Sequence, residues 1–213
     1  WGNPSDQVET TLRLEPSLPV CGLPNTLEFI AGNKAIQIEN LTVTKEGVLT
    51  IKVLEDATGK FLCEAGPLIV KDGVYGGYWG DLHGQSGESI GITNAREYFD
   101  FARNIAFLDV ISHQANDFQV NNAFWAHLNE LTAKHNQDGR LVTFPGYEWS
   151  GNTSVGGDRN VYFREEGRQI RRSSHALLPD QSDIHTDAND ARELFATLKD
   201  EDCCIYAHVG GRF

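Results

Sequence analysis

Three side chains able to bind a metal ion follow one short apolar run near the middle of the chain. Asp81, His83 and Gln85 are spaced two residues apart, directly after Tyr78–Gly80. Because side chains on a strand repeat every two residues, all three would point to the same face. A carboxylate, a neutral imidazole and an amide gathered at one strand end suit a divalent metal ion. The alternative is an ordinary transition from strand to loop, with His83 hydrogen-bonded locally.

The same pattern recurs three times, and each time an apolar run ends in a histidine or a carboxylate. Short apolar runs are typical of strands buried on both faces, and the loops at the carboxyl ends of parallel strands build ligand sites. We therefore expect these residues to share one metal site with His83, and Asp81 to be a further ligand. The runs and the residues that follow them are Phe107–Ser112 with His113, Leu141–Tyr147 with Glu148, and Cys203–Ala207 with His208.

Helix-like segments separate these runs. Residues 93–106, 121–135 and 190–199 carry apolar side chains at helical spacing, and Thr93 is suited to cap the first of them. Because strands and helices alternate from residue 78 onward, the pattern predicts βαβ units with a parallel sheet.

Residues 1–72 read differently. Short, partly alternating runs are separated by proline and glycine turn signals, which predicts an antiparallel β-sandwich-like domain with no helix. These runs are 9–14, 35–39, 48–53 and 60–63. The glycine-rich segment 71–77 suits a hinge. We therefore expect two domains, 1–72 and 73–213.

Composition excludes some classes of protein. The formal net charge of −12 argues against binding to a nucleic-acid backbone, and no apolar stretch is long enough to span a membrane. The four cysteines form no disulfide framework, and the adjacent Cys203 and Cys204 are expected to be buried structural thiols, which favours a reducing compartment such as the cytoplasm. The chain has no methionine, begins at Trp1 and stops just after His208. We therefore expect an interior piece of a longer protein, with both domains incomplete.

Three motifs resemble those of the polymerase-and-histidinol-phosphatase (PHP) superfamily of metal-dependent phosphoesterases. Asp81–His83 is similar to its first motif, Pro145–Glu148 to its glutamate motif, and Ala207–His208 to a later strand-end histidine motif. Longer stretches resemble a family of uncharacterised bacterial proteins in that superfamily, and together they span essentially the whole chain. These are residues 78–86, 113–118, 146–151, 156–161, 171–175 and 208–212.

The resemblance implies a fold and points to departures from the superfamily pattern. The implied fold is α/β, a distorted (β/α) barrel of PHP type of which only the first part is present. A small antiparallel β-sandwich-like domain precedes it, and Trp1–Pro4 resembles a point inside that domain rather than its beginning. Gln85 stands where the superfamily has the second histidine of its first motif. The nearest match to the second motif, which ends in Asp-His, is His113–Gln114. Asp158 stands where the motif after the glutamate commonly has a histidine. A carboxylate at that position favours harder ions such as Mn²⁺ or Mg²⁺.

The implied activity is metal-assisted hydrolysis of a phosphoester or a similar anionic ester, with one or more Mn, Zn or Fe ions activating water. Arg159, beside Asp158, would then clamp a small anionic substrate. The alternative is a non-catalytic binding protein whose metal site is degenerate or structural.

A basic cluster near His175 has two interpretations. Arg168, Arg171 and Arg172 would recognise an anion if their loop folds over the site, with His175 as a further catalytic candidate. The other interpretation is a solvated loop whose arginines pair with Glu165 and Glu166.

Overall fold

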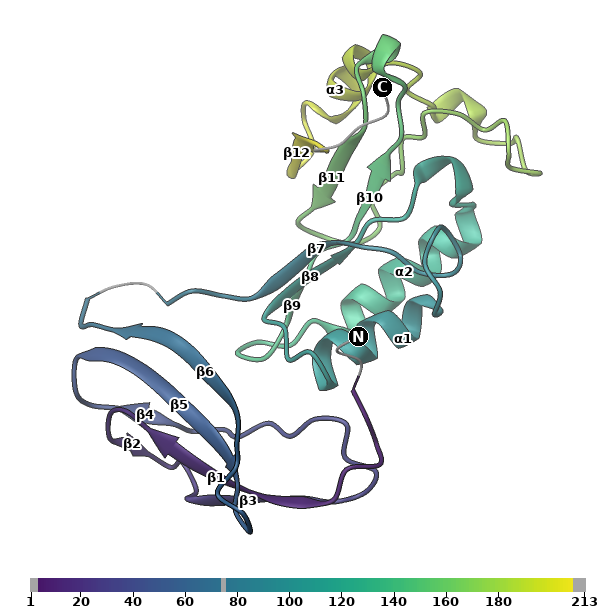
Figure 1. Cartoon of the computed structure of the whole chain (residues 1–213). Coiled ribbons are helices and arrows are strands. Elements are labelled where there is room, and N and C mark those ends of the chain that lie inside the picture. Colours follow the sequence, from purple (N-terminus) through teal and green to yellow (C-terminus); the bar gives the residue numbers. More distant parts are fainter. Residues whose placement is uncertain (1–3, 74–75, 209–213) are drawn as a thin grey trace. The chain divides into compact units, whose positions relative to one another are not determined.

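The computed structural model describes residues 4–73 and 76–208. The chain divides into two compact units, residues 1–77 and 78–213 (Figure 1). Three segments lie outside the described residues. They hold most of the Trp1–Pro4 motif, part of the predicted hinge, and all of the 208–212 motif except His208.

The first unit consists of antiparallel strands. Four of them form a sheet in the order β3-β1-β5-β6, and two short strands form a separate pair. The run 35–39, which alternates like a strand, forms none, and no helix occurs among the described residues of this unit. The strands are β1 Thr10–Pro16, β2 Val20–Cys21, β3 Thr26–Phe29, β4 Thr42–Val43, β5 Gly47–Glu55 and β6 Phe61–Val70.

The second unit begins with a parallel sheet of β7 (Gly80–Gly84), β8 (Val110–His113) and β9 (Val142–Thr143). Two helices, α1 (Ala95–Asn104) and α2 (Asn122–His135), connect these strands in turn. The predicted alternation of strand and helix is therefore present in this part of the chain.

Side chains fix where the helices begin. Asn94, rather than Thr93, caps α1, because its side chain accepts from the backbone N–H of Glu97 while the Glu97 carboxylate accepts from the backbone N–H of Asn94. Asn121 caps α2 by accepting from Phe124. The third helix, α3 (Ala191–Leu198), begins at Asp190, which accepts from two backbone N–H groups.

A second sheet follows, and it is antiparallel. It consists of β10 (Gly146–Trp149), β11 (Arg159–Phe163) and β12 (Cys203–Ala207). The connection from β10 to β11 contains only a short 3₁₀ turn, Thr153–Val155. Because no helix carries the chain back across the sheet, β11 reverses direction. The prediction that parallel βαβ units continue to the last strand was therefore wrong.

The predicted barrel is also wrong. The strands of the described chain lie in four small sheets, and none of these closes on itself. One cause is local: the predicted strand Leu141–Tyr147 is interrupted at Phe144–Pro145, so it contributes two strands to two different sheets. Proline lacks a backbone N–H and cannot continue a ladder. Most of the regular structure is strand, with three short helices among the described residues.

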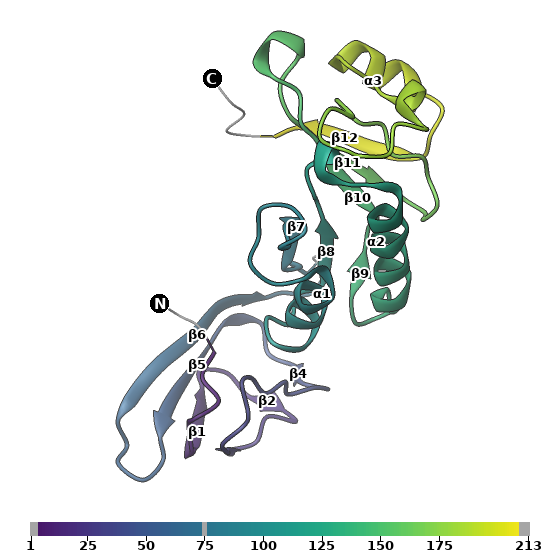
Figure 2. The same cartoon turned by 90° about the vertical axis from the view of Figure 1, so that its right-hand side faces the viewer.

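Alternation along the second sheet separates a core face from a polar face. Val161 and Phe163 are buried in one cluster with Leu194 and Leu198 of α3, and Figure 2 shows α3 covering this face. Glu148 pairs with Asn160, and Asn160 with Tyr206, so these three side chains share the opposite face. The fold thus directs polar groups to the side of the sheet that α3 leaves uncovered.

No helix in the described part of the chain has the length and apolar character needed to cross a membrane.

Candidate metal centre

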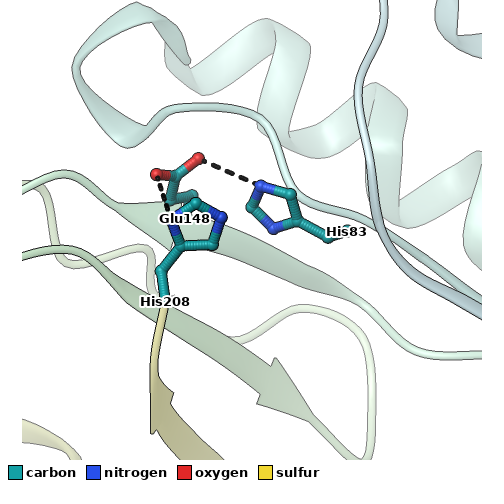
Figure 3. A group of neighbouring side chains, drawn as sticks. All are labelled: His83, Glu148 and His208. Carbon is teal, nitrogen blue, oxygen red and sulfur yellow. Dashed lines mark ion pairs between the residues drawn. The ribbon is translucent and has the colours of Figure 1, made fainter. Parts of the chain in front are cut away.

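The carboxyl ends of several strands meet at one edge of the second unit. β7 and β8 are parallel, and Glu148 of β10 forms a parallel bridge with Asn116, which follows β8. β12 runs in the same direction as β10, because both are antiparallel to β11. β7, β10 and β12 therefore bring His83, Glu148 and His208 to one place (Figure 3).

We define these three residues as the candidate metal centre. Their ligand atoms all lie within 4.8 Å of one another. His83 Nε2 lies 3.6 Å from Glu148 Oε2, and His208 Nδ1 lies 3.9 Å from Glu148 Oε1. The two imidazole rings are stacked, with centroids 4.3 Å apart. Two imidazole nitrogens and one carboxylate form a donor set that binds zinc in catalytic sites.

Asn160 holds the His83 ring in an orientation suited to a ligand. The amide oxygen of Asn160 lies 2.9 Å from His83 Nδ1. An amide oxygen only accepts, so Nδ1 carries the proton and Nε2, which faces Glu148, keeps its lone pair. Burial lowers the pKa of His83, and the neighbouring His208 lowers it further. The ring is therefore held in the neutral form that a metal requires.

Replacing Asn160 by leucine is expected to lower zinc affinity about 10- to 100-fold, because outer-shell partners that orient a histidine have effects of this size. Asn160→Asp keeps an acceptor for His83 Nδ1 and should retain most of the affinity. Isothermal titration with zinc measures both variants, and Asn152→Leu, at an exposed turn, is the matched control. Equal affinities for Asn160→Leu and the control would show that Asn160 does not orient the ligand.

Two side-chain amides hold the Glu148 carboxylate. Asn116 donates to Glu148 Oε2 at 2.9 Å, and Gln85 donates to the same oxygen at 3.3 Å. Glu148 itself is buried, with 5% of its surface exposed. Gln85, which stands where the resembled superfamily has a histidine, thus contacts the centre through the carboxylate. These donors also offset part of the cost of burying a negative charge.

His208 provides the clearest sign that the centre binds something. Its Nδ1 is buried and has no hydrogen-bond partner among the described residues, although it lies toward Glu148. The backbone N–H of His208 donates to the Asp158 carbonyl at 3.0 Å, which continues the ladder of β11 and β12 to this residue. A buried ring nitrogen without a partner is costly unless a ligand occupies its lone pair.

Two of the predicted ligands lie outside this group of three. The Asp81 carboxylate accepts from the backbone N–H of His83 at 3.0 Å and from the Tyr98 hydroxyl at 3.3 Å. His113 is buried, with its Nε2 2.8 Å from Ser86 Oγ and its ring edge-on to Tyr98. Burial lowers the pKa of His113 to about 4. Asp81 and the Nε2 side of His113 thus help to hold β7 and β8 against α1, whereas His113 Nδ1 is buried with no hydrogen-bond partner among the described residues.

Arg159, the predicted substrate clamp, Asp158, the further candidate for the site, and Gln114, the departure from the second motif, lie outside the group of three. The Arg159 guanidinium donates to the carbonyls of Gly157 and Asp158, at 3.3 and 2.9 Å. Asp158 is buried at the entrance to β11 and is not one of the three clustered residues. Gln114 donates to Ser112 and to the Val161 carbonyl, so it lies in the core between the sheets.

His175 belongs to a buried charge network away from the candidate centre. Its Nδ1 lies 2.6 Å from Asp187, and its Nε2 lies 2.9 Å from Asp183. Arg172 is fully buried and donates to Asp183 at 2.8 Å, to Asn122 and to the Val120 carbonyl. We call Arg172, His175, Asp183 and Asp187 the loop network, because it binds both ends of the segment 172–187 to the N-terminus of α2.

Neither interpretation of the basic cluster describes it completely. Arg168 is partly exposed and pairs with Glu165 at 3.0 Å and Glu201 at 3.5 Å, as a solvated loop would predict. Arg172, by contrast, is enclosed by its own partners.

Asp183 should make the stability of the loop network depend on pH. Burial raises the pKa of Asp183, but hydrogen bonds from Arg172 and His175 outweigh it and lower the pKa to about 2. Because this value is below the ordinary one, the carboxylate stabilises the folded state above about pH 4, and this contribution is lost as the pH falls toward 2.

Asp183→Asn should therefore lower the free energy of unfolding by about 1–3 kcal/mol near pH 6. The difference from the wild type should shrink between about pH 4 and 2. Urea unfolding at several pH values measures it, with Asp200→Asn, at an exposed position, as the control. A difference that stays constant down to pH 2 would contradict this assignment.

Asn160 and Asn116 are the functional residues that sequence reasoning missed. Asn160 carries a detectable signal, because it is a polar amide directly before the apolar run Val161–Phe163 and so requires a partner when buried. Asn116 lies in a loop, where an asparagine is unremarkable.

Comparison with known proteins assigns this chain to a family. Residues 79–205, more than half of the chain, match the family described as "Protein of unknown function (DUF3604)". The chain belongs to this family. An uncharacterised protein of Chlamydia pneumoniae is 23% identical over 141 residues, which cover 65% of this chain and 23% of that protein. The chain thus spans about a quarter of the relative's length. No solved structure matches the chain.

These matches correct the predicted classification. They place the chain in a family of unknown function, beside an uncharacterised relative, and not in the PHP superfamily. They also assign it to no class of hydrolases. The short motifs that suggested the superfamily consist of two to four residues each, and residues of these types recur at strand ends in many folds.

Proposed function

We propose that the second unit binds one divalent transition metal, Zn, Mn or Fe, through His83, Glu148 and His208, and that it hydrolyses a phosphoester or a similar anionic ester. The observation that carries the proposal is the convergence of two imidazoles and one carboxylate from three strands, with ligand atoms within 4.8 Å. The buried Nδ1 of His208, which has no hydrogen-bond partner among the described residues, supports it further.

The number of ligands favours catalysis over a structural role. Structural zinc sites are closed by four protein ligands, whereas catalytic sites have three and leave a position for water or substrate. A metal in such a site supplies a Lewis acid and lowers the pKa of a water molecule that it binds. In the proposed reaction the water oxygen is transferred to phosphorus, and the leaving alcohol takes up a proton.

The chain's own residues have two tasks in this proposal. Asn160 keeps His83 in the tautomer that exposes Nε2, and Asn116 and Gln85 fix the direction of the Glu148 carboxylate. Arg159 is committed to backbone carbonyls. Because these bonds use Nη1, the negative charge of the substrate would be met first at the metal.

Metal content and hydrolysis, measured on the same samples, test the proposal. The full chain, purified without chelator, should contain about one equivalent of metal by mass spectrometry and should hydrolyse bis(p-nitrophenyl) phosphate. His83→Ala and His208→Ala should lose both properties, whereas His127→Ala, at an exposed position on α2, should keep them.

The possible outcomes separate the two parts of the proposal. A chain that binds no metal would contradict both parts. A chain that binds one equivalent through these residues but hydrolyses no ester would retain the metal centre and would belong to the class of non-catalytic binding proteins.

A further inference from the structure

A cavity lies beside the candidate metal centre, on the face of the second sheet opposite α3. Its volume is about 340 Å³, near the lower end for small-molecule sites. We call it the tyrosine pocket. Its walls are mainly aromatic and apolar, and they are formed by Leu82, Phe144, Tyr162, Phe163, Cys204 and Tyr206.

The pocket adjoins the centre along two strands. Tyr162 is two residues from Asn160 on β11, and Tyr206 is two residues from His208 at the end of β12. Two residues along a strand span about 7 Å and return the side chain to the same face. A ligand whose reacting bond lies at the centre would therefore place a group in the pocket if that group lies about the length of one aromatic ring from the bond.

Two stacked tyrosines shape the pocket. The rings of Tyr162 and Tyr206 have centroids 5.3 Å apart and an interplanar angle of 18°. Tyr162 donates its hydroxyl proton to the Leu82 carbonyl at 2.5 Å, so Tyr206 is the donor in the 2.6 Å contact between the two hydroxyls. This chain of hydrogen bonds fixes both rings, while Tyr206 remains 43% exposed.

The charged residues at the pocket compensate each other. Arg164 Nη1 lies 3.4 Å from Asp202 Oδ2, and both side chains are largely exposed. Neither charge is left to attract an ionic group. The walls instead present an exposed tyrosine ring on which a planar group can stack.

We infer that the tyrosine pocket binds an aromatic group of an organic ligand, and that this ligand is the substrate whose ester is cleaved at the candidate metal centre. Only the second part, that this ligand is the substrate cleaved at the centre, rests on the proposed function. The pocket itself can be tested without metal or catalysis.

The experiment uses the full chain and 4-methylumbelliferone, a fluorescent aromatic alcohol without an ester. The wild type should bind it saturably, and Tyr206→Ala should weaken binding about tenfold, the upper range for loss of an aromatic pair. Cys204→Trp, which fills the pocket without removing a ring, should weaken binding as well. Tyr78→Ala replaces a tyrosine that is 80% exposed outside this pocket and should have no effect.

The outcomes distinguish the pocket from the metal centre. Binding that requires Tyr206 and survives EDTA supports the pocket, even in a chain that fails to bind metal. Binding that is equal in Tyr206→Ala, Cys204→Trp and Tyr78→Ala overturns the inference. If the centre is active, 4-methylumbelliferyl phosphate should be cleaved with a lower KM than methyl phosphate. Tyr206→Ala should remove this difference in KM, and Tyr78→Ala should keep it.

Discussion

Glu148→Gln should lower the affinity of the chain for zinc by more than about 100-fold, beyond the range typical of residues that only orient a ligand. The substitution keeps the size of the side chain but removes its charge. Asn116 and Gln85 both donate to Oε2, so the glutamine oxygen would turn toward them. Its NH₂ group would then take the place of Oε1, which lies beside His208 Nδ1, where it cannot bind a metal.

Isothermal titration with zinc measures this effect, and Glu130→Gln is the matched control. Glu130 is a glutamate on α2 whose side chain is 79% exposed. The control should bind zinc like the wild type. If both variants bind with the same affinity, Glu148 is not a ligand and the donor set of the candidate metal centre is wrong.

Arg172→Met should lower the free energy of unfolding by about 3–5 kcal/mol, the size typical of removing one member of a buried ion pair, because Asp183 then keeps His175 but loses its guanidinium partner. Arg172 is fully buried and contacts Asp183, Asn122 and the Val120 carbonyl at 2.8 Å. Methionine fills much of the same volume but replaces none of these hydrogen bonds. The segment 172–187 should then exchange its amide hydrogens faster.

Urea unfolding and hydrogen exchange check this prediction. Arg164→Met is the control, because Arg164 is 76% exposed and pairs with Asp202 at the surface. Exposed pairs contribute at most about 1 kcal/mol. A loss of stability in Arg172→Met no larger than in the control would mean that the loop network does not hold the segment.

The sequence predicted the candidate metal centre better than the fold around it. His83, Glu148 and His208 each follow an apolar run, and strand direction alone brings such positions together. Asp81 and His113 follow the same rule but point elsewhere, because Tyr98 and Ser86 bind them. Contacts of this kind join residues far apart in the chain, so spacing does not reveal them.

The barrel failed as a prediction for a different reason. Periodicity indicates the type of each element, but the direction of a strand depends on its connection to the next one. The β10–β11 connection reverses the chain, and the interruption at Phe144–Pro145 divides one predicted strand between two sheets. The run 203–207 also lies at the edge of its sheet with Cys204 exposed, whereas its apolar composition predicted burial.

The most direct test of the candidate metal centre is a crystal structure of the full chain grown with zinc, with anomalous data collected at the zinc absorption edge. We expect one strong anomalous peak about 2.0–2.2 Å from His83 Nε2, a ring nitrogen of His208 and an oxygen of Glu148. Ordered side chains at these three positions with no anomalous peak between them would contradict it.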